Sequence, residues 1–150
     1  MRRLFSWVLV LCLLLAGCSD TKTHTFDVQS GDKVTVTLDT TAGHKMSASG
    51  ASFTIKKDGA ETGGYFMEFD MIDDLFEWMP NNSSAEILKS GKNEYGTYML
   101  YSETCDGETL WSYVCTYDGT AIGVYLSNPV SGESLRDAVE HLSYSWEAAA

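Results

Sequence analysis

The chain has 150 residues, with 10 Lys and Arg against 21 Asp and Glu, a net charge of −11 and a pI near 4.5. This length suits one domain, and the acidic balance argues against a nucleic-acid binder, because few cations are available to neutralise a row of phosphates. A charged fraction of 21% with 12% aromatics is too apolar for a disordered chain. The composition therefore predicts a single folded domain.

The first segment is typical of a bacterial export signal. Two arginines follow Met1, and residues 4–16 form an apolar run of thirteen with one serine, too short for a permanent membrane helix, which needs about 20 residues. The run ends in Leu15-Ala16-Gly17-Cys18, which resembles the lipobox of bacterial lipoproteins. The resemblance implies cleavage of residues 1–17 and fatty acyl chains, palmitate among them, on Cys18. Such lipid would hold the protein on the extracytoplasmic side of the cell membrane.

Cleavage would make the remaining chain more acidic. Without the two arginines it carries 8 basic and 21 acidic residues, a net charge of −13 over 133 residues. Such a field favours cationic or neutral partners and opposes anionic ones, lipid headgroups included. We therefore expect residues 18–25 to be a lipid anchor and polar tether, and residues 26–147 to form one domain that lipid alone holds at the membrane.

Alternation of apolar and polar residues predicts short strands in the first half of this domain. The segments are residues 33–38, 52–57, 65–71 and 85–89. Between the last two, residues 73–79 begin with acidic side chains, which suit a helix N-terminus, and Pro80 stops the segment. We expect one short helix there.

The best-defined region runs from residue 96 to residue 128. Asp106-Gly107 and Asp118-Gly119 suit the positive φ angles of tight hairpin turns and separate three β-rich runs, so we expect an antiparallel meander. The register gives the meander one core face, made of Tyr98, Leu100, Trp111, Tyr113, Cys115, Ile122, Val124 and Leu126. The opposite face carries Met99, Tyr101, Val114 and Tyr125. We expect a helix to cover part of that second apolar face.

The C-terminal segment predicts a second helix over residues 131–142. Ser131 is a suitable N-cap, apolar residues follow at helical spacing, and Tyr144 and Trp146 come after as an apolar pair. The predicted fold class is therefore α+β, with an antiparallel sheet, one short middle helix and a C-terminal helix packed on the sheet. This order of elements resembles the PsbP/Mog1-like domains of small bacterial lipoproteins, which implies a binding or accessory role.

Four carboxylates form the densest polar cluster. Asp70, Asp73, Asp74 and Glu77 would share one helical face and could converge on a hard cation such as Ca²⁺. The simpler interpretation is a solvated helix face, because the spacing does not match an EF-hand loop. An envelope enzyme with an acidic site is one alternative function, and it would need a cleft that separates two carboxyl pKa values.

Neither the histidines nor any standard catalytic motif indicates a further site. His24, His44 and His141 have no second ligand at a metal-binding spacing such as H-x-x-x-H, so we expect no metal ion. Nucleophile-elbow, P-loop and dinucleotide-binding motifs are absent from the sequence. We therefore expect no catalysis and no cofactor.

Once the signal and the lipid site are set aside, Cys105 and Cys115 are the only cysteine pair. Export permits a disulfide. A tight turn at Asp106-Gly107 would instead pair Cys105 with Glu108 and Cys115 with Tyr98, and so separate the cysteines by roughly 23 Å along the strands. A disulfide tolerates Cα separations of about 4.4–6.8 Å. A bonded pair and two free thiols both stay open.

A second resemblance concerns Gly31-Asp32, the following strand and the loop of residues 39–46. Their order is similar to the start of chagasin-type cysteine-protease inhibitors, which implies an inhibitory loop there. The loop departs from the family pattern at Asp39, Thr40, Ala42, His44 and Met46. Inhibition is therefore an alternative function.

Aromatic residues offer a third idea for recognition. If Tyr95, Tyr101, Tyr125 and Trp78 were exposed together, they would form a platform for a protein or a glycan. The leading hypothesis is a lipid-anchored binding or accessory domain that contacts the membrane through Cys18 and has a protein or glycan partner.

Overall fold

The computed structural model describes residues 20–149. The predicted signal (residues 1–17) and the predicted lipid site, Cys18, lie outside these residues. The strands are β1 (Thr21–Asp27), β2 (Lys33–Asp39), β3 (Lys45–Ser49), β4 (Ser52–Lys57), β5 (Ala60–Glu68), β6 (Ala85–Lys92), β7 (Thr97–Cys105), β8 (Glu108–Thr116), β9 (Ile122–Asn128) and β10 (Leu142–Glu147). The helices are α2 (Phe69–Trp78) and α3 (Gly132–Glu140), with a 3₁₀ turn, η1, at Met79–Asn81.

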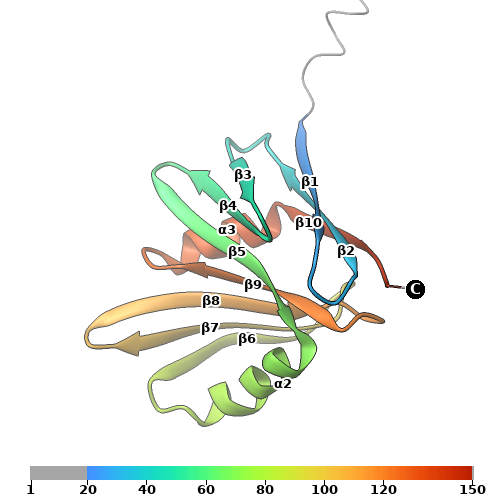
Figure 1. Ribbon diagram of the computed structural model, residues 1–150. Coiled ribbons are helices and arrows are strands. Elements are labelled where there is room, and N and C mark those ends of the chain that lie inside the picture. The colour runs from blue at the N-terminus through green and yellow to red at the C-terminus, as the bar shows by residue number, and fades with distance from the viewer. Residues whose placement is uncertain (1–19, 150) are drawn as a thin grey trace, which may run out of the picture.

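The strands form two antiparallel sheets (Figure 1). A three-stranded sheet has the order β1-β2-β10, and a seven-stranded sheet has the order β3-β4-β5-β9-β8-β7-β6. Hairpins join the strands from β3 to β5 and from β6 to β8, and β8 continues into β9. The pairings of β5 with β9 and of β2 with β10 bring together distant parts of the chain.

The predicted α+β class is wrong, because the fold is β-rich. Of the described residues, 56% lie in strands and 17% in helices, and the strands make two sheets rather than one. The strands that the sequence did not predict are β1, β3 and β10, which all lie at sheet edges. β1 and β3 contain few apolar residues and so carry little hydrophobic pattern. β10 does alternate, with Leu142, Tyr144 and Trp146 on one face, but Leu142 was assigned to the predicted helix. Residues 21–25, expected as tether, form most of β1.

The meander is confirmed in β7, β8 and β9. Cys105 pairs with Glu108 and Cys115 pairs with Tyr98 across the tight first turn, where Asp106 and Gly107 have the positive φ angles that this turn requires. The second turn is wider than expected, because Cys115 pairs with Val124. Relative to a tight turn the register moves by two residues, which leaves every side chain on its predicted face.

Helix α2 begins earlier than the sequence predicts. It starts at Phe69, so the expected strand of residues 65–71 ends at Glu68. Helix α3 follows the prediction more closely, since the Ser131 side chain accepts a hydrogen bond from the Ser134 N–H at 3.2 Å and so caps the helix. Helix α3 ends at Glu140, short of the predicted end at residue 142, and the chain then forms the strand β10.

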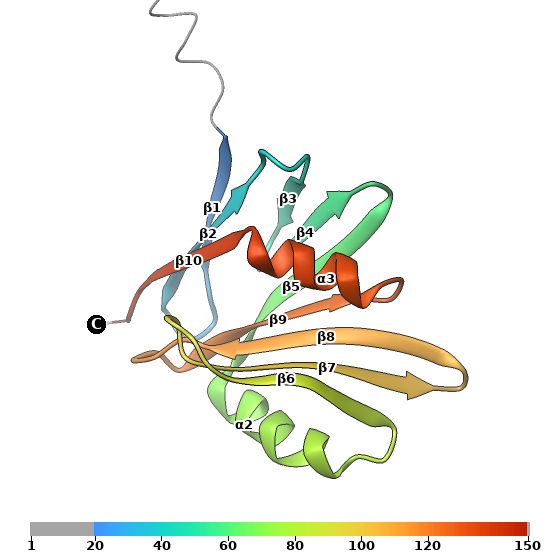
Figure 2. The same cartoon turned by 180° about the vertical axis from the view of Figure 1, so that it is seen from behind.

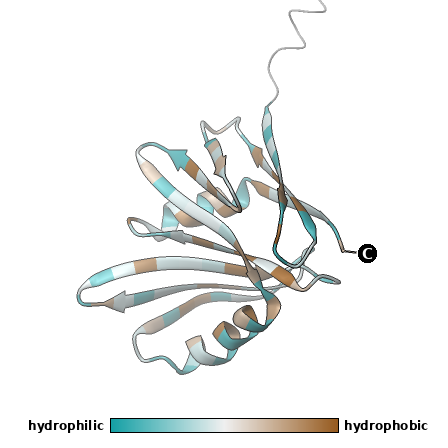
Figure 3. Cartoon of the chain, in the orientation of Figure 1, coloured by the Kyte–Doolittle hydropathy of each residue, from teal (hydrophilic) through white to brown (hydrophobic). Residues whose placement is uncertain are grey.

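Two hydrophobic clusters lie on opposite faces of the seven-stranded sheet. The larger one packs this sheet against α3 and the three-stranded sheet, with Leu38, Phe53, Val124, Leu126 and Leu135 among its most buried members. The smaller one packs α2 on the other face, through Ile72, Met79, Met99, Tyr101 and Val114. Figure 2 shows the two helices on the two sides of the sheet, and Figure 3 shows hydrophobic bands alternating with hydrophilic ones along the strands. The expected cover of the second apolar face is therefore α2.

Candidate functional site

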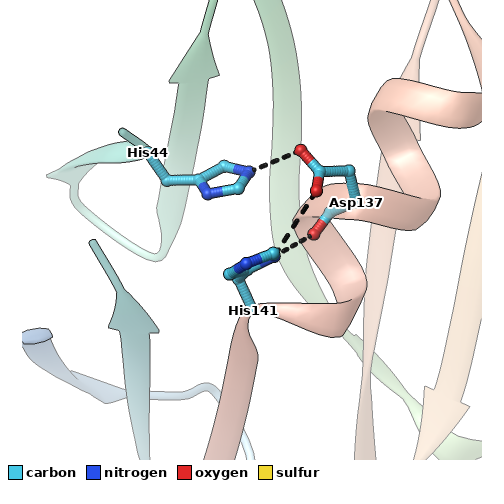
Figure 4. Close-up of side chains that lie close together, drawn as sticks. All are labelled: His44, Asp137 and His141. Carbon is cyan, nitrogen blue, oxygen red and sulfur yellow. Dashed lines mark hydrogen bonds and ion pairs between the residues drawn. The ribbon is translucent and has the colours of Figure 1, made fainter. Parts of the chain in front are cut away.

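Two histidines and an aspartate meet at one end of α3 (Figure 4). His44 directly precedes β3, Asp137 lies on α3, and His141 follows the last turn of that helix. One potential ligand atom from each of the three lies within 4.8 Å of the others. His44 Nε2 is 3.0 Å from Asp137 Oδ2, and the two imidazole centroids are 4.4 Å apart. We call these three residues the His–Asp–His cluster.

Asp137 organises the cluster through both its side chain and its backbone. Its Oδ2 also accepts a hydrogen bond from Lys57 Nζ at 2.7 Å, and its backbone carbonyl accepts one from His141 Nδ1 at 2.8 Å. The Lys57 hydrogen bond is the largest cause that holds the pKa of Asp137 below its usual range, with burial opposing it. Asp137 is therefore an ionised acceptor for three donors.

His44 is neutral near pH 7. Its side chain is only 1% exposed, and this burial lowers the pKa of His44 more than Asp137 raises it. Since an ionised carboxylate only accepts hydrogen bonds, the proton of neutral His44 lies on Nε2. The lone pair is then on Nδ1, which is buried and has no hydrogen-bond partner.

The sequence did not predict this cluster. Asp137 and His141 are four residues apart and so share a helix face, but this Asp-x-x-x-His spacing lacks the second histidine of an H-x-x-x-H pair. His44 lies 93 residues before Asp137, and only the packing of the segment before β3 against α3 brings it into contact. His44 and His141, which have no second histidine at a metal-binding spacing, therefore meet in space, while His24 lies on β1 outside the cluster.

A second candidate site is a cavity of about 470 Å³ between α3 and the strands β6, β7 and β8. We call it the basic pocket. It is lined by Leu88, Lys89, Lys92, Asn93, Tyr98, Leu100, Tyr113, Arg136, Val139 and Glu140. Leu100 and Tyr113 are buried, whereas Lys89, Lys92 and Arg136 are exposed at its rim. Tyr98 and Tyr113 stack at 6.0 Å between ring centroids.

The basic pocket concentrates the few cations of the molecule. Residues 20–149 contain eight Lys and Arg, and three of them, Lys89, Lys92 and Arg136, line this pocket. Within the described part of the chain none of the three forms an ion pair, whereas three other lysines pair with Asp27, Glu61 and Asp137. The rim of the basic pocket therefore offers uncompensated positive charge.

The predicted acidic site does not converge. Asp70, Asp73, Asp74 and Glu77 all lie on α2 and all are exposed. Among residues 20–149 the groups able to hold a metal ion comprise the His–Asp–His cluster and no carboxylates of α2. The structure therefore supports the simpler interpretation of a solvated helix face.

Cys105 and Cys115 are free thiols. The hairpin register excludes a disulfide between them, because they pair with residues at opposite ends of β7 and β8. Cys115 is fully buried, and burial raises the pKa of its thiol, so this cysteine is unreactive. Cys105 is exposed beside the first meander turn.

The other two recognition hypotheses gain no support from the geometry. In the loop of residues 39–46, the position that would be aromatic in an inhibitor is His44, which is buried against α3. The four aromatics of the proposed platform do not gather on one surface. Tyr101 is 2% exposed, Tyr95 packs on Tyr144 and Trp146, and Trp78 is 54% exposed.

The chain matches no protein-family model, no curated protein and no solved structure. The resemblances to lipoproteins, to PsbP/Mog1-like domains and to chagasin-type inhibitors therefore stay predictions from the sequence. Neither helix among residues 20–149 is long and apolar enough to cross a membrane. The function has to be argued from the sites.

Proposed function

We propose that this protein is a lipid-anchored extracytoplasmic binding domain without catalysis of its own, and that its ligand is a small organic anion with an apolar body. The basic pocket is the observation that carries the proposal. Its volume, about 470 Å³, lies in the range of small-molecule sites, and such sites combine an apolar lining with a few polar groups that orient the ligand.

The charge of the rim selects the class of ligand. Arg136, Lys89 and Lys92 face one carboxylate in the lining, that of Glu140. A guanidinium suits a carboxylate or phosphate because it donates two parallel hydrogen bonds. The net negative charge of the whole chain opposes an anion, but exposed charges more than about 8–10 Å away are largely screened at physiological ionic strength. The local cations therefore dominate at the rim.

A matched series of probes tests this ligand class. Octanoate, octanol and octylamine share one apolar chain and differ in charge, and their binding to the purified full chain is measured by calorimetry. We expect octanoate to bind at least tenfold more tightly than the other two.

Arg136→Gln should weaken the binding of octanoate about tenfold, because a hydrogen bond to a charged group contributes about 1.5–3 kcal/mol. Lys45→Gln, at the opposite sheet edge, is the control and should change nothing. Equal binding of all three probes would refute the proposal.

The lipid anchor is tested separately in bacterial cells. The protein should incorporate labelled palmitate, and globomycin should block its processing. Cys18→Ala should move most of the protein from the membrane fraction to the soluble fraction, since one or more acyl chains provide the membrane affinity. Full membrane retention of the Cys18→Ala protein would disprove the anchor and leave the pocket proposal standing.

A further inference from the structure

We propose that the His–Asp–His cluster is a binding site for a divalent transition-metal ion of the Zn²⁺ class, with one nitrogen from each of His44 and His141 and a carboxylate oxygen of Asp137 as ligands. This inference is independent of the anion-binding function, because none of these three residues lines the basic pocket. Imidazole nitrogen and carboxylate oxygen are common Zn²⁺ ligands, and two histidines with one carboxylate leave a position open for water.

The distances need little change to accept an ion. Bonds of about 2.0–2.2 Å in a tetrahedron put ligand atoms roughly 3.3 Å apart. His44 Nε2 and Asp137 Oδ2 are already 3.0 Å apart, and all three ligand atoms lie within 4.8 Å of one another. Figure 4 shows both imidazoles directed at Asp137. Closing the site takes a shift of the less buried His141 side chain and the release of Lys57 from Asp137.

The hydrogen bond of His141 fits the pattern of a metal ligand. A ligating histidine usually donates its second ring N–H to a carboxylate or a backbone carbonyl, which fixes the ring. Here His141 Nδ1 donates to the Asp137 backbone carbonyl at 2.8 Å, which leaves Nε2 as its ligand atom. At His44 the ligand atom is Nε2, which faces the Asp137 carboxylate. An ion there takes the place of the Nε2 proton, and the proton moves to Nδ1.

An ion has a route to the cluster and a field that attracts it. A cavity of about 230 Å³ opens beside His44 and Asp137, and two further carboxylates, Asp58 and Glu133, line it. The net charge of the chain is −11, which raises the local concentration of cations. Both features favour a metal cation over any anionic ligand at this place.

Lys57 competes with a metal ion for the carboxylate of Asp137. Its ammonium lies 2.7 Å from Asp137 Oδ2 and compensates that carboxylate. A bound ion must displace it, and the long side chain, 28% exposed, can turn toward solvent. The proposal therefore predicts that Lys57→Met tightens metal binding, whereas a cluster that is only structural predicts no such gain.

Zn²⁺ titration of the purified full chain tests the proposal. All variants carry Cys105→Ser, because an exposed thiol binds Zn²⁺ by itself. We expect one equivalent of Zn²⁺ to bind, at least tenfold weaker binding in His141→Gln and in Asp137→Asn, and at least threefold tighter binding in Lys57→Met. His24→Gln removes the remaining histidine and should bind as the parent does. Octanoate binding should be the same in all of these variants.

Spectroscopy separates metal binding from a loss of folding. Co²⁺ in place of Zn²⁺ should give the visible absorption of a tetrahedral site, and the imidazole ¹⁵N resonances of His44 and His141, but not of His24, should shift on adding Zn²⁺. Circular dichroism identifies any variant that fails to fold, and Lys57→Met, at a partly exposed position, keeps the test decisive in that case. Unchanged affinity in both His141→Gln and Lys57→Met, or no Zn²⁺ binding by the parent, would overturn the proposal.

Discussion

Two tyrosine hydroxyls are buried without hydrogen-bond partners. They belong to Tyr117 and Tyr144, whose rings are 5.4 Å apart in an aromatic cluster with Tyr95 and Trp146. A buried hydroxyl without a partner is unfavourable by about 1–3 kcal/mol. These residues hold the end of β10 against the meander at some expense of stability.

Removing one of these hydroxyls should stabilise the fold. Tyr117→Phe is expected to raise the free energy of unfolding by up to about 1 kcal/mol, because the ring stays and the unpaired group goes. Tyr113→Phe is the matched control, since its hydroxyl accepts a hydrogen bond from Asn93 at 3.2 Å, and it should lose about 1 kcal/mol. Urea unfolding followed by fluorescence gives both values. A less stable Tyr117→Phe would show that the hydroxyl has a partner after all.

Buried tyrosines also predict an alkaline limit of stability. Burial is the largest cause that raises the pKa of Tyr101 and of Tyr117. The folded state keeps these groups protonated, whereas the unfolded state ionises them above its ordinary pKa of about 10. The contribution of these tyrosines to stability is therefore complete below about pH 10 and is lost as the pH rises above it. Urea midpoints measured from about pH 8 to about pH 11.5 should fall over the upper part of that range, and a constant midpoint would contradict the assignment.

At the scale of elements, α2 is the cover of the second apolar face of the large sheet. Its contact residue Ile72 is 0% exposed, and its carboxylates point to solvent. The sequence predicted that this face needs cover and that a helix lies near residues 73–79. It did not predict that the helix starts at Phe69, because residues 65–71 alternate like a strand. The helical start follows from the packing of Ile72 against the sheet, which is a tertiary contact.

Truncation of Ile72 tests the role of α2. Ile72→Ala should lower the free energy of unfolding by about 2–5 kcal/mol, since a fully buried side chain leaves a cavity. Met71→Ala, at a neighbouring position 54% exposed, should change it by less than about 0.5 kcal/mol. Urea unfolding measures both. Equal effects of the two substitutions would mean that α2 is not packed on the sheet.

At the scale of the molecule, the fold depends on pairings between distant segments. β10 pairs with β2, which completes the three-stranded sheet, and β5 pairs with β9, which joins the β3–β5 hairpins to the meander in the seven-stranded sheet. A local pattern can mark a strand but not its partner, and these partners lie far apart in the chain. The predicted α+β class was wrong for this reason. The sequence did predict both helices, from the residues at their ends, and the meander, from its two Asp-Gly turns.

The two candidate sites depend on the same helix. Asp137 and His141 lie toward the segment before β3, and Arg136 and Val139 lie toward the basic pocket. The sequence by itself determined the acidic balance, the register of the first meander hairpin, the Ser131 cap and the lipobox pattern at Cys18, because each is written in neighbouring residues. Only the tertiary structure decided the second sheet, the free cysteines and both sites. Their residues are separated by up to 97 positions, from His44 to His141, and packing free energy, which no short segment contains, brings them together.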